Sequence, residues 1–398
     1  MTKRFFSILL LFLVGDLYFY QAVTTLTQNP LIHLGYWLID ILLIAGMVSI
    51  IFMLRAGIRP HRFISVLMSG VLMIFVPKLF SSSVLLVEDL VRLFRGFPAR
   101  SIYVSEATVT LAGVLFLIIL FGFTRGKHFY KVRRETLYFP DLPEAFDGFT
   151  ITQISDIHSG SFSDVKGVQK GINLANAQKS DLLLFTGDLV NNMASEMDPW
   201  IPAFAKLKAP CGKYSVLGNH DYGDYIKWEN QADKAANLKR LKEIHAEIGF
   251  KLLLNDTATI NKGGQSIALI GVENWGKGGF HKYGDLKQAT LNVPDNAFKI
   301  LMSHDPSHWD EVTVDHHQHV HLTLAGHTHG MQFGIELFGF KWSPIKYVYK
   351  QWAGLYAQDG KYLYVNRGFG FHGIKGRIGM WPEITVLTLK RGNTKQIA

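Results

Sequence analysis

The first third of the chain contains four long apolar runs that are nearly free of charge. They cover residues 5–27, 31–54, 63–87 and 104–124, and each approaches the roughly 20 residues that a helix needs to cross a bilayer. We therefore predict four transmembrane helices. Pro77 and Lys78 interrupt the third run, so the pattern allows either a complete span with a tolerated proline or a re-entrant segment.

The pattern changes after a polar connector over residues 125–148. Short runs rich in β-branched and aromatic residues then alternate with amphipathic stretches, which is typical of an α/β domain. Five runs are predicted to be buried strands: residues 149–155, 181–187, 213–218, 298–303 and 320–326. Helices are predicted over 164–178 and 233–248, and further strands over 265–273, 361–368 and 383–389. We assign residues 1–134 to a transmembrane region with its connector and residues 135–398 to the α/β domain.

The chain has a net charge of +9, and the whole excess lies in residues 1–134. That part holds 14 Lys and Arg against 5 Asp and Glu, whereas the remainder holds 27 of each sign. The excess is expected to contact anionic lipid head groups, and the balanced α/β domain argues against binding to nucleic acid. Basic residues flank the runs on one side of the predicted membrane, so the positive-inside rule places both termini and the α/β domain in the cytoplasm.

Three ionisable residues, Asp16, His33 and Asp40, fall within the predicted spans. Charged groups inside a bilayer are unfavourable and are often functional. Near the end of a span they can equally reach the interface or bond to a neighbouring helix. The sequence leaves both roles open for these residues.

Polar side chains directly follow each of the five predicted strands. Asp156 and His158 follow the first, Asp188 the second, Asn219, His220 and Asp221 the third, His304 and Asp305 the fourth, and His327 and His329 the fifth. Singly, such residues often cap helices or form turns. Because the carboxyl ends of strands in open α/β sheets converge on a ligand crevice, we expect them to meet at one site. So many buried polar groups would be unfavourable there without a bound partner.

The donor types at this edge are carboxylate, imidazole and amide, with no thiolate. Such a set suits divalent Mn, Fe or Zn, whereas Ca²⁺ sites are all oxygen and structural Zn²⁺ sites usually contain cysteine. The donors outnumber those that a single tetrahedral ion takes. Two ions about 4 Å apart that share a carboxylate would accommodate them, and that arrangement suits hydrolytic attack on phosphorus.

Five motifs carry a family resemblance: "SDIH", "TGDLV", "LGNHD", "MSHDP" and "AGHTHG", in this order and each after a predicted strand. From about residue 140 onward they resemble the calcineurin-like metallophosphoesterase family. The resemblance implies a four-layer αββα sandwich of two mixed sheets that holds two divalent metal ions. It assigns Asp156, His158 and His329 to one ion, Asn219, His304 and His327 to the other, and Asp188 as the bridge. It also makes His220 the general acid that protonates the leaving oxygen. Asp221 either orients His220 or binds loop amides.

Two further segments, "LPEAFDGFTITQISDIHSG" and "YVNRGFG", resemble the transmembrane members of this family. The expected location is therefore a bacterial-type inner (plasma) membrane, with a multi-pass anchor. The sequence departs from that subgroup at Met331, where a second glycine usually follows "GHTHG". The departure concerns the shape of the loop beside the site and affects none of the expected metal ligands.

Weaker patterns surround these motifs. "GFGFHG" (368–373) matches GxGxxG but lacks a following helix, which favours a substrate-facing glycine loop over a nucleotide fingerprint. Arg367 beside it is a candidate phosphate ligand because guanidinium matches phosphate geometry, and His372 is expected to be a surface histidine. The His-rich tract 315–321 is expected to be an exposed edge rather than a further metal site, and the aromatic segment 333–352 could form an apolar, membrane-facing wall.

Two functions are compatible with these patterns. The first is a membrane-anchored, binuclear-metal phosphoesterase that hydrolyses a phosphoester or pyrophosphate bond in a lipid-linked or amphipathic substrate. The alternative is a transmembrane sensor or transporter whose phosphoesterase-like domain binds a regulatory ligand. The complete set of expected ligands favours the first function. The predicted spans also offer few polar residues for a transport pathway, which argues against the alternative. The substrate, the native metals and the oligomeric state stay open.

Overall fold

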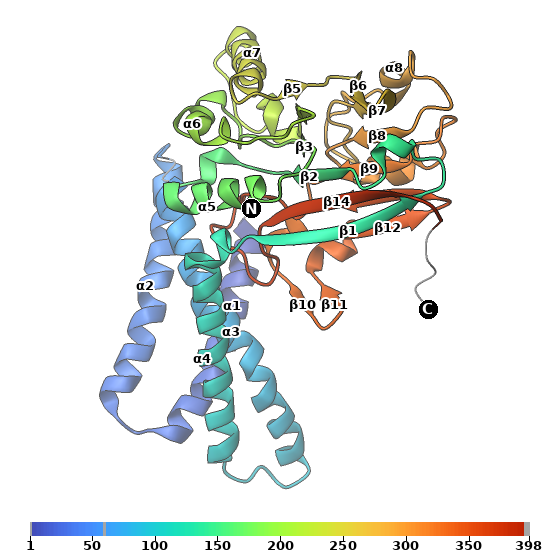
Figure 1. Cartoon of the computed structure of the whole chain (residues 1–398). Coiled ribbons are helices and arrows are strands. Elements are labelled where there is room, and N and C mark those ends of the chain that lie inside the picture. Colours follow the sequence, from blue (N-terminus) through green and yellow to red (C-terminus); the bar gives the residue numbers. More distant parts are fainter. Residues whose placement is uncertain (1, 59–60, 394–398) are drawn as a thin grey trace. The chain divides into compact units, whose positions relative to one another are not determined.

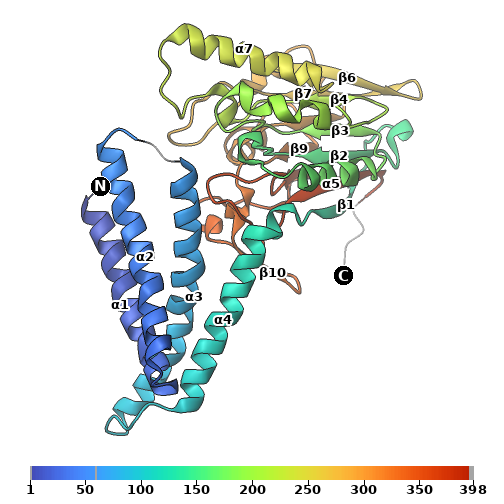
Figure 2. The same cartoon turned by 90° about the vertical axis from the view of Figure 1, so that its left-hand side faces the viewer.

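The computed structural model of the chain describes residues 2–58 and 61–393. It divides into two compact units (Figures 1 and 2). One unit contains Met1–Thr124 together with Gly373–Lys375, and the other contains Arg125–His372 together with Gly376–Ala398. The division falls between Thr124 and Arg125, so the connector residues 125–134, which the sequence analysis assigned to the transmembrane region, lie in the second unit.

In its described residues, the first unit contains four helices, at the positions of the apolar runs. They are α1 (Thr2–Leu26), α2 (Pro30–Arg55), α3 (His61–Leu93) and α4 (Ile102–Thr124). Within the described residues, Pro30–Arg55, Val66–Leu93 and Ile102–Thr124 are long and apolar enough to cross a membrane, and the apolar part of α1 covers Leu10–Leu26. Helix α3 continues through Pro77 as a single 33-residue helix, so the third run is a complete span and not a re-entrant segment.

Two of the three ionisable residues inside the spans meet a common partner. The ammonium group of Lys78 on α3 lies 2.6 Å from Asp16 Oδ1 on α1 and 3.0 Å from Asp40 Oδ1 on α2. His33 lies apart from them, with Nδ1 2.8 Å from the hydroxyl of Tyr20. The carboxylates therefore link three helices through one lysine, which is the neighbouring-helix role that the sequence left open.

The second unit is built on two mixed six-stranded sheets. The first has the order β1 (Lys131–Phe139), β14 (Glu383–Arg391), β2 (Thr150–Ile154), β3 (Leu182–Phe185), β4 (Lys213–Ser215) and β5 (Lys251–Leu252). The second has the order β12 (Gly354–Gln358), β13 (Lys361–Val365), β9 (Leu322–Ala325), β8 (Lys299–Met302), β7 (Gln265–Gly271) and β6 (Asp256–Lys262). A separate two-stranded ribbon joins β10 (Ile335–Leu337) to β11 (Phe340–Trp342).

Alternation along the strands explains why the sheets pack face to face with helices outside them. Leu182 and Leu184 of β3 lie in the core between the sheets, together with Ile300 of β8. Leu183 faces the opposite way, into the layer of α5 (Val165–Asn176), α6 (Ile201–Phe204) and α7 (Gln231–Glu247). Leu301 similarly faces the layer of α8 (Leu286–Thr290). Burial of each leucine side chain stabilises the folded state by about 2 kcal/mol. The order of helix layer, sheet, sheet and helix layer confirms the predicted four-layer αββα class.

One strand lies in the region that the sequence pattern assigned to a polar connector. Residues 131–139 form β1, which pairs in parallel with β14 over its whole length. The sequence pattern did not indicate a strand here because the segment contains the charged residues Lys131, Arg133 and Arg134. Charged side chains are tolerated in β1 because it is an edge strand. The strands that matter most for the site run parallel, namely β2, β3 and β4 in one sheet and β8 and β9 in the other. Their carboxyl ends therefore carry the polar motifs to a common edge.

Candidate metal centre

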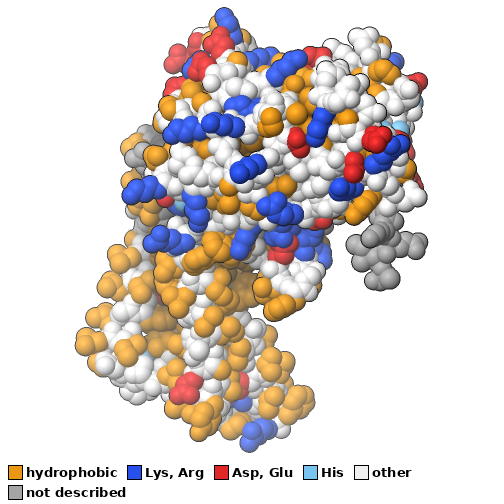
Figure 3. Space-filling model, in the orientation of Figure 1, with side chains coloured by type: hydrophobic (Ala, Val, Ile, Leu, Met, Phe, Trp, Pro, Cys, Tyr) orange, Lys and Arg blue, Asp and Glu red, His pale blue; other side chains and the backbone are white. Residues whose placement is uncertain are grey.

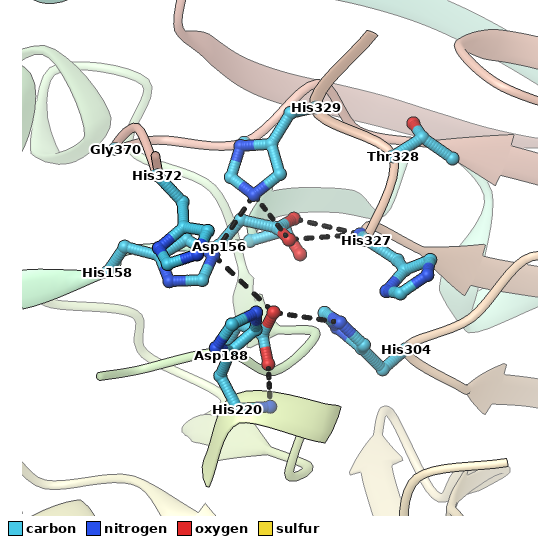
Figure 4. A network of polar contacts seen from close by, with 12 residues as sticks. Asp156, His158, Asp188, His220, His304, His327, Thr328, His329, Gly370 and His372 are labelled. Atoms are coloured by element: carbon cyan, nitrogen blue, oxygen red, sulfur yellow. Dashed lines mark hydrogen bonds and ion pairs between the residues drawn. The ribbon is translucent and has the colours of Figure 1, made fainter. Parts of the chain in front are cut away.

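Three of the expected ligands form one group at this edge (Figure 4). Asp156 follows β2, His158 lies two residues on, and His329 comes from the loop after β9. His329 Nε2 lies 3.3 Å from Asp156 Oδ1 and 3.0 Å from His158 Nε2. All three residues offer donor atoms within 4.8 Å of one another, so they could hold a metal ion.

Asp188, His304 and His327 form a second group with the same spacing. Asp188 Oδ2 lies 3.2 Å from His304 Nε2 and 3.4 Å from His158 Nε2, so this carboxylate lies between the two groups. Asn219 joins the second group, since its Oδ1 lies 2.9 Å from His327 Nδ1. The structure thus brings together all seven residues that the sequence proposed as ligands.

The backbone at five of these residues adopts the left-handed conformation. The φ angles are 50° at Asp156, 47° at His158, 61° at Asp188, 71° at His327 and 52° at His329. For residues with a Cβ this conformation is unfavourable by about 1–3 kcal/mol each and is concentrated at functional sites. The fold therefore holds the ligands in place against local backbone preference.

His304 shows that these residues fit a cation. Its Nδ1 donates a hydrogen bond to the carbonyl of Thr186 at 2.7 Å. A neutral imidazole then presents a lone pair at Nε2, which is buried, has no hydrogen-bond partner and faces the Asp188 carboxylate. Two acceptors that face each other in a buried site require positive charge between them; a proton on the imidazole supplies it without metal, and a divalent ion would supply it in the proton's place.

The electrostatics of the groups keep Asp188 ionised and the His158 and His329 rings neutral. Burial would raise the pKa of Asp188, but the imidazoles of His304 and His220 hold it well below its ordinary value. Burial lowers the pKa of His158 and His329 well below the usual range, so both rings are neutral. His304 differs: burial opposes its protonation, but the Asp188 carboxylate outweighs it and raises the pKa to about 10. The ionised carboxylate thus attracts a positive charge at this position.

His220 lies beside the two groups. Its Nδ1 donates to the backbone carbonyl of Asn191 at 2.8 Å, and its backbone N–H donates to Asp188 Oδ1 at 2.9 Å. These two bonds fix the ring and direct Nε2 away from the carbonyl. The ring centroid lies 4.9 Å from that of His158. The His220 ring is therefore held in a fixed orientation next to the two groups.

Comparison with known proteins identifies the fold and its chemistry. A family model described as "Probable Calcineurin-like phosphoesterase, transmembrane domain" matches residues 3–127, and one described as "Calcineurin-like phosphoesterase" matches residues 149–331. The metallophosphoesterase YkuE of Bacillus subtilis is 31% identical over 279 residues, which are 69% of this chain and 91% of that protein. The chain belongs to the calcineurin-like metallophosphoesterase family.

Two other relatives of this metallophosphoesterase cover different shares of the chain. A Danio rerio protein named "Transmembrane protein with metallophosphoesterase domain" is 24% identical over an alignment of 404 positions, which covers 96% of this chain and 87% of that protein. The phosphodiesterase YaeI of Escherichia coli is 27% identical over 273 residues, which are 66% of this chain and 88% of that protein. The metallophosphoesterase described here is thus a membrane protein and a metal-dependent phosphoester hydrolase.

The geometry decides between the two roles that the sequence allowed for Asp221. Its carboxylate accepts hydrogen bonds from the backbone N–H groups of Gly218 at 2.8 Å, Asp188 at 2.9 Å and Leu189 at 2.8 Å. The bonds from Asp188 and Leu189 join the loop after β3 to the loop after β4, and the bond from Gly218 lies within the latter. Asp221 therefore binds loop amides and holds Asp188 in place.

Two arginines near the C-terminal strand differ from the sequence-based picture. The guanidinium of Arg367 forms a buried ion pair with Glu383 at 2.5 Å and contacts Glu336 at 3.0 Å, so it is engaged outside the two ligand groups. Its role as a phosphate ligand stays a prediction. Arg377, which no motif singled out, is fully buried and contacts His329 Nδ1 at 3.1 Å and the carbonyl of Gly370 at 2.6 Å. The guanidinium donates to Nδ1 and so fixes the orientation of the His329 ring.

His372 lies against the site, although we expected it to be a surface residue. Its ring stacks on His158 with centroids 4.7 Å apart, and the centroid of His220 is 4.5 Å away (Figure 4). Burial lowers the pKa of His372 to about 4. His158, His220 and His372 make a third group of donors within 4.8 Å. The only sequence signal for His372 was its place in the glycine loop.

One of the two remaining motifs has a structural explanation, and the other, the His-rich tract, is not the exposed edge that we expected, because Gln318, Val320 and His321 are buried. In "GFGFHG", a Cβ at Gly370 would collide with the carbonyl oxygen of Ile157, so the second glycine permits close packing of two loops beside the site. Among the described residues, the His-rich tract belongs to none of the groups that could hold a metal. His321 at its end is buried and contacts Asp141 at 2.7 Å.

Proposed function

We propose that this metallophosphoesterase is a membrane-anchored, binuclear enzyme that hydrolyses a phosphoester or pyrophosphate bond in a lipid-linked or amphipathic substrate. The observation that carries the proposal is the position of Asp188 between two groups of ligands, with contacts to His158 and His304. A carboxylate in that position suits a bridge between two ions. The balanced charge of residues 135–398 next to a basic, apolar anchor supports a substrate that resides in the membrane.

The roles of the residues follow from their positions. Asp156, His158 and His329 would hold one divalent ion, Asn219, His304 and His327 the other, with Asp188 shared between them. When bound, Mn, Fe or Zn ions would activate water at neutral pH and stabilise charge on the phosphoryl oxygens. The neutral amide of Asn219 limits the negative charge of the site, which favours entry of an anionic phosphoester.

His220 would act as the general acid. Its Nδ1–H is engaged with the carbonyl of Asn191, so the proton at Nε2 is the one available for the leaving oxygen. Loss of that proton leaves a neutral imidazole, which the carbonyl still holds in the same orientation. The ring thus stays in place through a catalytic cycle.

The basic residues that flank the helices support a cytoplasmic active site in an inner or plasma membrane. Arg125, Lys127, Lys131, Arg133 and Arg134 all follow α4. Protease protection of tagged, inverted membrane vesicles tests this orientation. Digestion of the catalytic unit in right-side-out vesicles would contradict it.

The test of the activity uses full-length protein purified in detergent, stripped with a chelator and reloaded separately with Mn, Fe or Zn. Bound metal is measured alongside turnover of bis(p-nitrophenyl) phosphate and alongside losses from a total lipid extract in mixed micelles. We expect two metal equivalents and metal-dependent hydrolysis of the diester and of at least one lipid. Metal binding without any hydrolysis would instead favour the sensor or transporter alternative.

A further inference from the structure

The β10–β11 ribbon of the catalytic unit carries exposed hydrophobic side chains on a convex projection. Ile335 is 48% exposed, Leu337 60%, Phe340 60%, and Phe338 at the turn is completely exposed. Figure 3 shows hydrophobic side chains at the end of this ribbon, next to a group of Lys and Arg side chains. These side chains do not pack against the core, and a contiguous exposed apolar surface is unfavourable in water. Such a surface therefore indicates a binding or membrane-interaction site.

The turn that follows extends the same surface. Tyr347 and Val348 are each 74% exposed, and they stand between Lys346 and Lys350. Both lysines are exposed, and Lys350 Nζ lies 3.8 Å from Asp310 Oδ1. Lysines around exposed aromatic and aliphatic groups are typical of protein surfaces that enter the head-group region of an anionic bilayer.

The ribbon is tied to the candidate metal centre at both ends. It begins just after His329, and the hydroxyl of Ser343 donates to the carbonyl of Gly330 at 2.8 Å. At the far end, Tyr349 Oη lies 2.7 Å from His327 Nε2, and the hydroxyl of Thr328 donates to the carbonyl of Trp352 at 2.6 Å. A partner that binds the ribbon is therefore held next to the loop that supplies two metal ligands.

We propose that the ribbon and the Tyr347–Val348 turn insert into the interface of an anionic lipid bilayer and bring the catalytic centre to the lipid surface. The inserting set consists of Ile335, Leu337, Phe338, Phe340, Tyr347 and Val348, with Lys346 and Lys350 at the phosphate level. The bilayer is the occupant because the surface is convex and basic, and because the chain already carries membrane helices. A peptide or a second copy added to the edge of the ribbon as a further strand would leave Phe338 at the turn exposed, whereas a bilayer covers it.

Insertion is tested with full-length protein in liposomes, independently of any activity. Cys211 is replaced by serine, and an environment-sensitive fluorophore is attached at Phe338→Cys or, as the matched control, at Ser266→Cys, an exposed position next to the β6–β7 turn. Lipids brominated along the acyl chain should quench the label at 338 and not at 266, and more strongly when the vesicles contain phosphatidylglycerol. No quenching at 338, or equal quenching at both positions, would overturn the proposal.

The catalytic consequence rests on the proposed phosphoesterase function and has its own assay. Phe338→Asp should raise KM for a phospholipid presented in vesicles by at least about tenfold, the factor that corresponds to removing one large apolar side chain from lipid. Turnover of soluble bis(p-nitrophenyl) phosphate should not change. If the wild type hydrolyses neither substrate, the proposed function fails and the quenching result still stands. An unchanged KM in the variant would refute the interfacial role.

Discussion

His304 and Asp188 face each other across 3.2 Å, with a buried imidazole nitrogen that has no hydrogen-bond partner on one side and a carboxylate oxygen on the other. The hydrogen bond from His304 Nδ1 to Thr186 sets this orientation before any ligand binds. The pair is therefore preorganised for a cation, and the remaining ligand contacts are arranged around it.

Removal of metal should destabilise the catalytic unit, because the clustered carboxylates lose their counter-charge. An ion at 100-fold excess over its Kd stabilises the folded state by about 2.7 kcal/mol. We expect Mn²⁺ added after chelation to raise the Tm of the full-length protein in detergent. Asp188→Ala should abolish this response, whereas Asp147→Asn, at an exposed carboxylate, should retain it. An equal metal response in Asp188→Ala would contradict the bridging position.

Loss of His220 should slow turnover without loss of metal. As the proposed general acid it contributes about 10²–10⁴-fold, so His220→Ala should reduce kcat by that factor for an alkyl leaving group. The loss should be much smaller for p-nitrophenol, which needs little protonation. Activity against both ester types and bound metal are measured in the same preparations. Equal losses for good and poor leaving groups would exclude the acid role.

Met331 occupies a position that suits glycine, since its φ is 55° and its side chain is 50% exposed. Met331→Gly should stabilise the protein by about 0.5–1 kcal/mol, because the left-handed conformation is strained for residues with a Cβ. Leu291→Gly is the matched control, with an exposed side chain and φ of −53°, and should be destabilising. Thermal unfolding in detergent distinguishes the two. A loss of stability in Met331→Gly would show that the side chain has contacts that outweigh the strain.

Much of the site could be predicted because its determinants are local in sequence. Alternation in "DLLLFTG" gives a strand with Leu182 and Leu184 on one face, and the position of Asp188 after that strand places its carboxylate at the sheet edge. The same reasoning applies to His304 after β8. Residue type, order and strand ends were sufficient for these positions.

The rest depends on contacts between segments far apart in the chain. Arg377 reaches His329 across 48 positions, and no local pattern distinguishes it from other arginines. His372 stacks on His158, and Gly370 two residues before it lets its loop pack closely against the carbonyl of Ile157. Strand β1 was not predicted because it pairs with β14, which lies at the opposite end of the catalytic unit in the sequence. Such long-range packing overrides local composition.

Lys78 should stabilise the membrane unit by neutralising Asp16 and Asp40. Lys78→Met leaves two carboxylates without a cation, and removing one partner from a buried ion pair costs about 3–5 kcal/mol. The triple variant Lys78→Met, Asp16→Asn, Asp40→Asn should recover most of that loss. Unfolding in mixed detergent and SDS micelles measures it, with Arg55→Met as a control at an exposed helix end. A triple variant no more stable than Lys78→Met would rule out unpaired carboxylates as the cause.

His245 should make the catalytic unit sensitive to acid. The ring is fully buried, with Nδ1 2.9 Å from Ser215 Oγ, and burial lowers its pKa to about 3. Below the ordinary value of about 6.5 the unfolded chain takes up a proton that the folded state refuses. This contribution to stability is therefore complete above pH ~6.5 and is lost as the pH falls toward ~3, with a limiting slope of about 1.4 kcal/mol per pH unit.

The variant His245→Phe keeps an aromatic ring against Phe185, whose centroid is 5.9 Å away, and removes the titrating group. The free energy of unfolding of the metal-free, full-length protein is measured at several pH values between about 4.5 and 7. The wild type and the variant share every other titrating residue, so the difference between their free energies reports on His245. The difference in the free energy of unfolding between the wild type and His245→Phe should change with pH at the predicted slope. The control His317→Phe, at an exposed ring, should give a curve of the same shape as the wild type. Parallel curves for the wild type and His245→Phe would mean that the buried ring accepts its proton without unfolding, through a rearrangement that exposes it to water.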